Sequence, residues 1–415
     1  MFENYKGHFL NLSNLDCSSA INMNKMFSNS IELISLDLSN FTVLNIEEMD
    51  YMFSSCSNLE VLNLSSFYTP KIISAKNTFQ NCYSLKYINL GRFDGSLIKG
   101  LFSSCYNLEF IDISNILMDK IEYMNEMFYD FHFLKRLDLP KFNTEKVKNF
   151  SEMFYNCYNL ETINFNSFNT SSAYGDAFKK MFYNCSQLKS IDLSRFETCL
   201  ITSMSQMFYN CSNLEELNLE AFNTSSVIDL QEMFSGCTKL KKLDISNFDT
   251  SNVINMEGIF SNCENLNYIN FENIKTNSLL EMSEMFKGNI NLNYLNLISL
   301  EILHSINILN ILSEVNNNII YCINDESKAI TIKQEFDKKE NATNNCTLIC
   351  QKEEKQYLSE AGICSITCIN EDINKYIYED KCVLGCPLNS PYELVIYNLC
   401  TKKCFSGEFL LKSVK

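Results

Sequence analysis

Nine cysteines near the C-terminus have the residue type and spacing for covalent cross-linking. Eight of them form four C-x3-C pairs, each starting 18 residues after the previous one, and a ninth precedes the pairs. These cysteines are Cys322, then Cys346 and Cys350, Cys364 and Cys368, Cys382 and Cys386, and Cys400 and Cys404. The roughly 70 residues that hold the pairs contain few large aliphatic side chains, so they can hardly form a core unaided. We therefore predict a disulfide-stabilised array, as expected in an oxidising compartment.

Two other chemistries stay open for the same pairs. Zinc tetrathiolate sites accept C-x3-C spacing, although C-x2-C is more usual. Adjacent C-x3-C motifs also resemble the redox-imported helical hairpins of small mitochondrial chaperones, but the four copies, the Cys386-Pro387 step and the preceding repeats argue against that fold. Eight cysteines allow on the order of 100 pairings, so we assign none. With Cys322 included, one thiol is left for Cys17, Cys199, another chain or a residue after 415.

A second group of cysteines recurs in the phrase M-F-x-x-C. Its members are Cys56, Cys82, Cys105, Cys157, Cys185, Cys211, Cys237 and Cys263, with Ser30, Phe131 and Asn289 at the same position in three further units. A catalytic thiol needs a nearby base, and the histidines His8, His132 and His304 lie in separate units. We therefore interpret these cysteines as reduced, inward-facing thiols that fill space and form weak hydrogen bonds to a turn. The sequence predicts no catalytic residue and no enzyme.

These cysteines mark an internal repeat of eleven units. The step is 26 residues, with one step of 23 and one of 28, and a phenylalanine always stands three positions earlier. Aliphatic residues six and eight positions after the cysteine are separated by one polar residue, which is the pattern of a short, half-buried strand. One unit cannot cover its own apolar face, but stacked neighbours can. We predict a right-handed, leucine-rich-repeat-like solenoid with a continuous parallel β-sheet, closed on the opposite side by short helical turns at the M-x-x-M-F segments.

The domain organisation follows from where these patterns stop. We predict a solenoid over residues 1–323, a polar linker over 324–345 and the cysteine-rich tail over 346–415. In this register Cys322 faces outward on the last strand, where it can bond to the segment that follows. Residue 1 falls inside a unit, and residue 415 is followed by no capping pattern. We therefore expect a sequence truncated at both ends, so that the missing signal peptide says little about location.

Composition excludes some classes of partner. The formal net charge is -16, whereas binding to nucleic acid requires an excess of Lys and Arg. No apolar run approaches the roughly 20 residues that span a bilayer. The sequence thus predicts no nucleic acid partner, no membrane span within these residues, and no metal or cofactor.

Two columns of side chains should face outward from the sheet. The column seven positions after the cysteine is Asn or Asp in every unit, which suits a hydrogen-bonded ladder, with a shared cation site as the alternative. The column five positions after it carries exposed aromatic and charged residues, which are typical of recognition surfaces. Our candidate binding residues are Tyr87, Phe110, Arg136, Tyr268 and Tyr294. Sequons at Asn341 and Asn345 lie in the polar stretch, where a glycan would be tolerated.

The complete unit resembles a known repeat family. The stretch from Leu240 through Leu243-Asp244-Ile245-Ser246, Phe248 and Thr250-Ser251 to Met256 and Cys263 is similar to the 26-residue leucine-rich repeat of BspA-like bacterial surface proteins. The similarity covers about residues 9 to 323, and related repeats with cysteine-rich extensions occur in protist surface proteins. Phe131, Asn289 and Ile116 depart from the pattern. The resemblance implies a surface or secreted protein engaged in adhesion, with no catalytic residues to carry over.

These observations lead to two functional hypotheses. The first is a non-enzymatic, extracellular or cell-surface adhesion protein that binds a protein or glycan on a host cell, on matrix or on another cell through its repeat surface. The second is a structural coat or spacer protein whose chains are cross-linked through cysteines.

Overall fold

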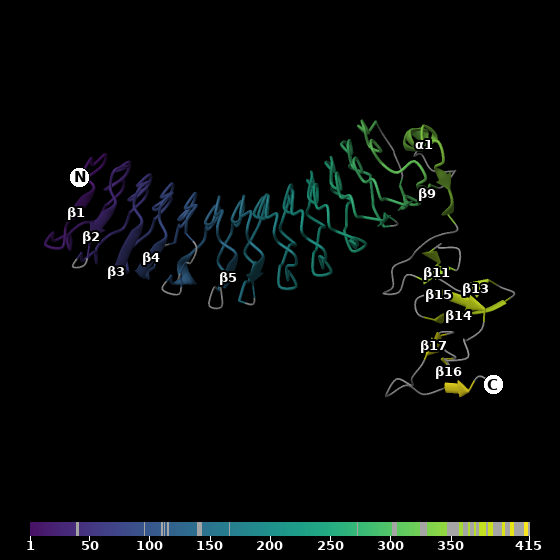
Figure 1. Ribbon diagram of the computed structural model, residues 1–415, viewed down its shortest axis with the longest axis horizontal. Helices are drawn as coiled ribbons and strands as arrows, with labels where there is room; N and C mark the ends of the chain where they lie inside the picture. The colour runs from purple at the N-terminus through teal and green to yellow at the C-terminus, as the bar shows by residue number, and fades with distance from the viewer. Residues whose placement is uncertain are drawn as a thin grey trace.

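The computed structural model describes residues 1–346, apart from 39–40, 95, 109–110, 112, 114–115, 139–142, 166, 272, 301–304 and 324–329. After residue 346 it describes the backbone of eight short strands. The repeat region is a parallel β-solenoid of about 12 coils. The coils lie side by side in one curved row (Figure 1). This is the fold that the repeat period predicts.

Each strand of the solenoid holds the aliphatic pair of one unit. In β3 (Val61–Thr69), Leu62 and Leu64 are buried while Val61 and Asn63 face solvent. Pairing is parallel and in register, so that Leu62 lies beside Ile88 of β4 (Tyr87–Phe93). The other strands are β1 (Phe9–Asn11), β2 (Ser35–Asp37), β5 (Arg136–Asp138), β6 (Thr162–Asn164), β7 (Tyr268–Asn270), β8 (Tyr294–Asn296) and β9 (Ile320–Cys322), with one 3-10 turn at Met118–Lys120.

The sheet is less continuous than the sequence suggests. The paired groups are β1 with β2, β3 with β4, β5 with β6, and β7 to β9 with one further strand. Among the described residues between β6 and β7, the aliphatic tracts at 191–193, 217–219 and 243–245 are not in strands. Figure 1 shows that the strands lie on the longer, outer side of the curved row. Neighbouring tracts diverge on that side, and ladder hydrogen bonds require a spacing of about 4.8 Å.

The M-x-x-M-F segments form the shorter, inner side and are turns rather than the helical turns expected. Two residues between the first methionine of each segment and the following cysteine position have positive φ, for example Tyr51 (φ 56) and Ser55 (φ 60). A left-handed residue at every fourth position breaks the helical pattern. Every second N–H therefore points to the next coil, as in the bonds from Phe53 N to the Thr78 carbonyl (2.8 Å) and from Ser55 N to the Gln80 carbonyl (2.7 Å). The inner side thus carries the more continuous hydrogen-bond ladder.

The core is a column of stacked phenylalanines that runs the length of the solenoid. From Phe27 to Phe286, successive rings lie 5.3 to 6.4 Å apart with planes within 12° of parallel. All of these rings are buried. Burying one such side chain contributes about 1.5 to 3 kcal/mol, and a stacked pair about 0.5 to 1.5 more. Each coil therefore covers the ring of its neighbour, as the repeat requires.

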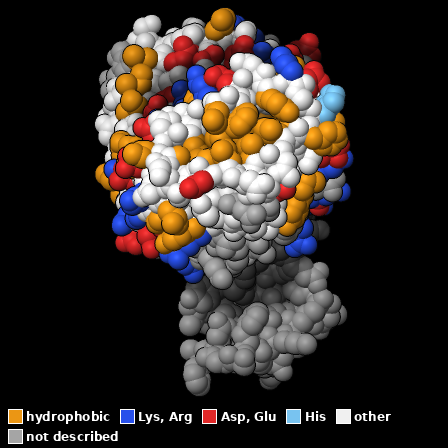
Figure 2. Space-filling model, turned by 90° about the vertical axis from the view of Figure 1, so that its left-hand side faces the viewer, with side chains coloured by type: hydrophobic (Ala, Val, Ile, Leu, Met, Phe, Trp, Pro, Cys, Tyr) orange, Lys and Arg blue, Asp and Glu red, His pale blue; other side chains and the backbone are white. Residues whose placement is uncertain are grey.

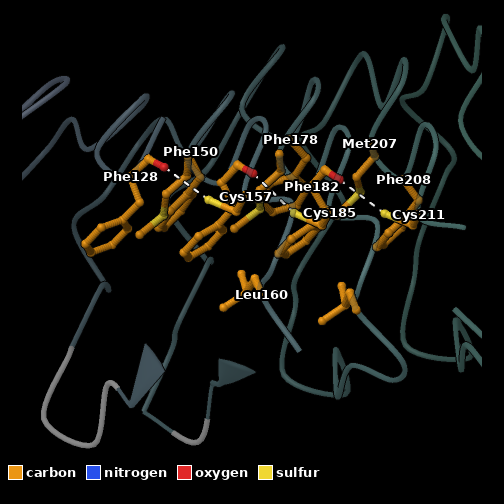
Figure 3. Close-up of a cluster of buried hydrophobic side chains, with 14 of the residues drawn as sticks. Phe128, Phe150, Cys157, Leu160, Phe178, Phe182, Cys185, Met207, Phe208 and Cys211 are labelled. Atoms are coloured by element: carbon orange, nitrogen blue, oxygen red, sulfur yellow. Dashed lines mark hydrogen bonds between the residues drawn. The ribbon is translucent and has the colours of Figure 1, made fainter. Parts of the chain in front are cut away.

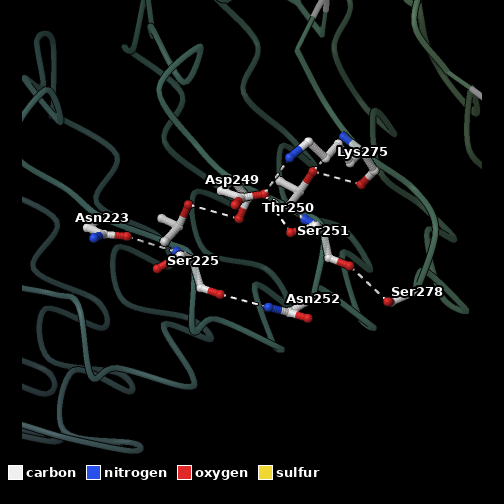
Figure 4. Close-up of polar contacts among 9 residues, drawn as sticks. Asn223, Ser225, Asp249, Thr250, Ser251, Asn252, Lys275 and Ser278 are labelled. Carbon is white, nitrogen blue, oxygen red and sulfur yellow. Dashed lines mark hydrogen bonds and ion pairs between the residues drawn. The ribbon is translucent and has the colours of Figure 1, made fainter.

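A third side of each coil is held by polar side chains (Figure 4). Thr250 Oγ1 donates to the Lys275 carbonyl at 2.7 Å, and the Lys275 N–H donates back to Thr250 Oγ1 at 2.8 Å. Asp249 accepts from the Ser251 N–H at 3.1 Å, which fixes the turn. The N-T-S phrase of the repeat thus links successive coils through hydrogen bonds rather than through apolar contacts.

The last coil is capped by residues expected to be a linker. Helix α1 (Ile330–Asp337) buries Ile332 and Phe336, and the Phe336 ring stacks on Tyr321 at 3.9 Å. Strand β10 (Thr343–Asn344) then pairs in parallel with β9. The linker prediction is therefore wrong for 330–345, because two apolar side chains four residues apart give the short helix a buried face. Residues 324–329 lie outside the description.

At the other end, Phe2 stacks on Phe27 at 5.6 Å. Leu10, Leu12 and Leu15 are only partly buried against the core. Figure 2 accordingly shows hydrophobic side chains gathered on this end of the solenoid.

The tail contains short strands in a mixed sheet. Their order is β12, β11, β15, β14, β17, β16 and β18, and β13 pairs with β14. Their bounds are β11 (Tyr357–Ser359), β12 (Cys364–Ser365), β13 (Ile369–Asn370), β14 (Ile373–Tyr378), β15 (Lys381–Leu384), β16 (Tyr392–Leu394), β17 (Leu399–Thr401) and β18 (Leu411–Ser413).

Candidate functional site

Two of the five candidate binding residues face solvent on the outer side. Tyr87 is 47% exposed on β4, and Arg136 is exposed on β5. Phe110 lies outside the described residues. The outer side therefore presents these two side chains in separate strand pairs.

The other two candidates are less accessible than the sequence suggests. The rings of Tyr268 and Tyr294 stack at 5.4 Å and within 9° of parallel. Tyr268 is half-buried, but Tyr294 is only 8% exposed. The prediction that Tyr294 is exposed is wrong, because its strand lies between β7 and β9 at the capped end. In the column seven positions after the cysteine, Asn296 of β8 and Cys322 of β9 are also fully buried.

One disulfide joins the solenoid to its cap. Cys322 of β9 bonds to Cys346, with their Cα atoms 4.6 Å apart. Cys346 therefore does not pair with Cys350 of its own C-x3-C motif. Of the remaining candidates, Cys364, Cys382 and Cys400 lie on β12, β15 and β17, but their side chains are outside the description, as are Cys350, Cys368, Cys386 and Cys404.

The cysteines of the repeat are structural thiols, as predicted. All eight are buried and free. Each thiol lies 3.1 to 3.2 Å from the carbonyl oxygen of a core phenylalanine one coil earlier, as Figure 3 shows for Cys157, Cys185 and Cys211. Ser30 makes the same bond to Phe2 at 3.1 Å. Burial raises the pKa of Cys56 and of Cys263 to about 12, so both are neutral at physiological pH.

A row of tyrosines on the inner side was missed by our sequence interpretation. Tyr129, Tyr155, Tyr183 and Tyr209 stand two positions before the cysteine in four successive coils. Their rings are 4.6, 4.5 and 4.6 Å apart and within 6° of parallel. All four side chains are half-buried. We call these four residues the inner ladder.

A second aromatic row runs beside the inner ladder. Tyr83, Tyr106, His132 and Tyr158 stand one position after the cysteine, with ring centroids 4.9, 4.5 and 5.0 Å apart. Between the two rows, the amides of Asn156, Asn184 and Asn210 each donate to the preceding coil, starting at Asp130, over 2.7, 2.8 and 2.9 Å. The eight rings of both rows form what we call the aromatic strip.

Burial keeps the hydroxyls of Tyr129, Tyr155 and Tyr183 protonated by raising their pKa values. Burial raises the pKa of Tyr183 to about 12, and Tyr155, Tyr209 and Glu232 add to the effect. Burial followed by the Asp130 carboxylate likewise raises the pKa of Tyr129. The Lys180 ammonium lies 5.9 and 5.8 Å from the ring centres of Tyr155 and Tyr183. The ladder thus presents neutral hydroxyls and ring edges among carboxylates and one central cation.

The sequence did contain a signal for this strip. The phrase F-Y-N-C or F-Y-D-F occurs in four successive units, whereas most other units have serine after the phenylalanine. The outward columns that we predict from the sequence all lie in or next to the strand, because side chains of a strand alternate between the inside and the outside. A turn with left-handed residues has none, so its exposed positions follow only from the structure.

No helix within the described residues is long and apolar enough to cross a membrane. In the same part of the chain, no group of three or more His, Cys, Asp or Glu side chains could hold a metal ion.

Solved structures similar to this chain are leucine-rich repeat proteins. One from Bacteroides ovatus is 20% identical and covers 67% of this chain and 82% of its own, with a TM-score of 0.30. A leucine-rich cell surface protein from Faecalibacterium prausnitzii is 18% identical and covers 70% and 80%, with a TM-score of 0.41. The pneumococcal vaccine antigen PcpA is 16% identical and covers 82% and 80%, with a TM-score of 0.36. A comparison with curated proteins gives no match.

One family model matches three overlapping segments, residues 1–99, 96–190 and 176–297. Together these segments span more than half of the 415 residues. The chain therefore belongs to the family described as Mycoplasma protein of unknown function, DUF285.

Proposed function

We propose that this chain is a non-enzymatic recognition protein of the cell surface or extracellular space, which adheres to a partner through its aromatic strip. The observation that carries the proposal is that the fold does not need these tyrosines. Ser28, Ser54, Ser235 and Ser261 occupy the same position in other coils, where the turn is the same. Tyrosine is enriched in protein interfaces, where its ring provides contact area and its hydroxyl a hydrogen bond. The resemblance of the unit to the BspA-like surface repeat supports the same function.

The stacking favours a protein over a glycan as the partner. Within the inner ladder, neighbouring rings are 4.5 to 4.6 Å apart and nearly parallel, so each ring face between them is covered. A sugar that stacks on an aromatic residue needs an uncovered face. Ring edges and hydroxyls in a regular row instead suit contacts with a polypeptide.

The experiment is a cell-adhesion assay with the whole chain. Fluorescently labelled protein is incubated with epithelial cells and with fibronectin-coated surfaces, and bound label is measured before and after treatment of the cells with trypsin or glycosidases. We expect trypsin to abolish binding and glycosidases to leave it. Replacing all four tyrosines of the inner ladder by serine should reduce binding at least about tenfold. Tyr174→Ser, at an exposed tyrosine outside the strip, is the matched control. An equal loss in this variant, or no binding to either surface, contradicts the proposal.

A specific observation also supports a second candidate, a coat protein linked through cysteines. Among the described free cysteines, Cys199 is exposed and Cys17 is partly exposed. Non-reducing electrophoresis tests this candidate, since Cys17→Ser with Cys199→Ser should then abolish discrete oligomers.

A further inference from the structure

We propose that the partner presents a basic polypeptide segment, with an arginine stacked on Tyr209 at the end of the inner ladder and further basic residues on the carboxylates beyond it. This inference rests on the proposed function and specifies the chemistry of the partner.

The ladder ends at Tyr209. One face of its ring lies on Tyr183 at 4.6 Å. In the next coil, Ser235 and Gly236 occupy the positions that hold an aromatic and an amide side chain in the preceding coils, and Ser235 is buried. The row of rings therefore meets two small residues here. A planar guanidinium stacks well on an aromatic face, whereas an ammonium lacks the shape to do so.

In the two coils after Tyr209, Glu232 and Glu257 are held by amides rather than by cations of the described residues, in contrast to Glu126 before it. At the start of the ladder, Lys99 pairs with Glu126 at 2.9 Å. After the ladder, Glu232 accepts from the Gln206 amide at 2.6 Å, and Glu257 from the Gln231 amide at 2.8 Å. Neutral amides donate hydrogen bonds to these carboxylate oxygens but do not neutralise the negative charges of Glu232 and Glu257.

Repulsion from neighbouring carboxylates acts on Glu257, which lies beside them on the same side of the solenoid. Burial raises the pKa of Glu257, and the charges of Glu281, Glu232 and Glu284 raise it further. Lys287 Nζ lies 3.0 Å from Glu284 Oε2 and neutralises the charge of Glu284. A basic ligand beside Glu232 and Glu257 would relieve the remaining repulsion, so the charge distribution favours a cationic partner.

The spacing of the coils sets the spacing of the basic residues. An extended chain rises about 3.3 Å per residue, and coils at the ladder are separated by roughly 4.6 Å. Two residues of the partner thus span about one and a half coils. An arginine on Tyr209 places the residue two positions later between the coils of Glu232 and Glu257, which lie one and two coils away. The expected motif therefore has basic residues at alternate positions.

The experiment uses three synthetic peptides with Arg, Lys or Glu at alternate positions, separated by serine, and fluorescence anisotropy with the full chain. We expect the arginine peptide to bind about fivefold more tightly than the lysine peptide, and both to weaken at about 300 mM NaCl, where screening is strong. The glutamate peptide should not bind. Equal affinity for the arginine and glutamate peptides, or no binding of either basic peptide, overturns the inference.

Variants then locate the site. Tyr209→Ser should lower affinity for the arginine peptide about fivefold and make it equal to that for the lysine peptide, whereas Tyr209→Phe keeps the difference. Glu232→Gln with Glu257→Gln should weaken both basic peptides about tenfold. Tyr174→Ser, at an exposed tyrosine outside the strip, is the control and should leave the affinity of both basic peptides unchanged. An unchanged Arg/Lys ratio in Tyr209→Ser overturns the stacking contact. Strip-dependent adhesion to cells without peptide binding refutes only this inference, whereas peptide binding without cell adhesion refutes the proposed function.

Discussion

Replacing Phe182 by alanine tests whether coils stabilise one another through the phenylalanine column. Phe182 is fully buried, 5.6 Å from Phe154 and 5.4 Å from Phe208. Truncating a buried phenylalanine costs about 3 to 5 kcal/mol, and two stacked pairs place this site in the upper part of that range. Domain stabilities are about 5 to 15 kcal/mol, so the loss should remove a large share of the total. Because solenoid stability depends on contacts between neighbours, unfolding should also separate into two transitions.

The assay is urea unfolding followed by far-UV circular dichroism, with hydrogen exchange to find the weakened coils. Tyr183→Ser is the control, since it removes the adjacent ring of the half-exposed inner ladder and leaves a residue natural to this position. Tyr183→Ser should lower the free energy of unfolding by less than about 1 kcal/mol. Equal losses for Phe182→Ala and Tyr183→Ser would refute the reasoning, because then the inward column would be no more important than the outward one.

Three further predictions follow from the thiols, the cap and the buried acids. Iodoacetamide at pH 8 should label Cys199 and Cys17 in the native chain but none of the eight core thiols, as measured by peptide mass spectrometry; labelling of Cys185 would contradict the burial. Cys322→Ser with Cys346→Ser should cost about 3 kcal/mol through the loop of 24 residues that the disulfide closes, and should increase hydrogen exchange in α1 first. The contribution of the core thiols to the free energy of unfolding should be constant below about pH 9 and fall towards pH 12. The unfolded state loses thiol protons near the ordinary value of 9.0, whereas the pKa of folded Cys56 and Cys263 is about 12, so protons are bound more tightly by the native state across this range. A flat profile to pH 12 would contradict the raised pKa values.

The repeat period carried most of the information about the fold. Phenylalanine at one fixed position and aliphatic residues at two others leave one arrangement in which every coil covers the next. The form of the turn was less predictable, although glycine at Gly236, Gly258 and Gly288 marks positions with positive φ (75, 54 and 74°). Lysine, glutamate or asparagine occupies the same positions elsewhere, and these residue types do not indicate a positive φ in the sequence.

The candidate site was predicted less well, for a different reason. Exposure of the outer columns changes at the end of the solenoid, where Tyr294 is buried and where the cap bonds to Cys322 through a segment that the repeat does not contain. The signal for the cap was present but short. Ile332 and Phe336 are one helical turn apart in a polar stretch, and a single apolar pair does not distinguish a helix from a linker.

The two sides of the solenoid differ in what they offer a partner. On the inner side, hydrogen bonds join the turn segments at nearly every coil, and the tyrosine rings keep a regular spacing of 4.5 to 4.6 Å. On the outer side, strand pairing is interrupted between β6 and β7, so outward side chains lack a constant separation. A partner that makes the same contact at several coils needs a fixed spacing, since each misplaced contact must be paid for by strain. For this reason we place the proposed contact with a partner on the inner side, where the aromatic strip lies.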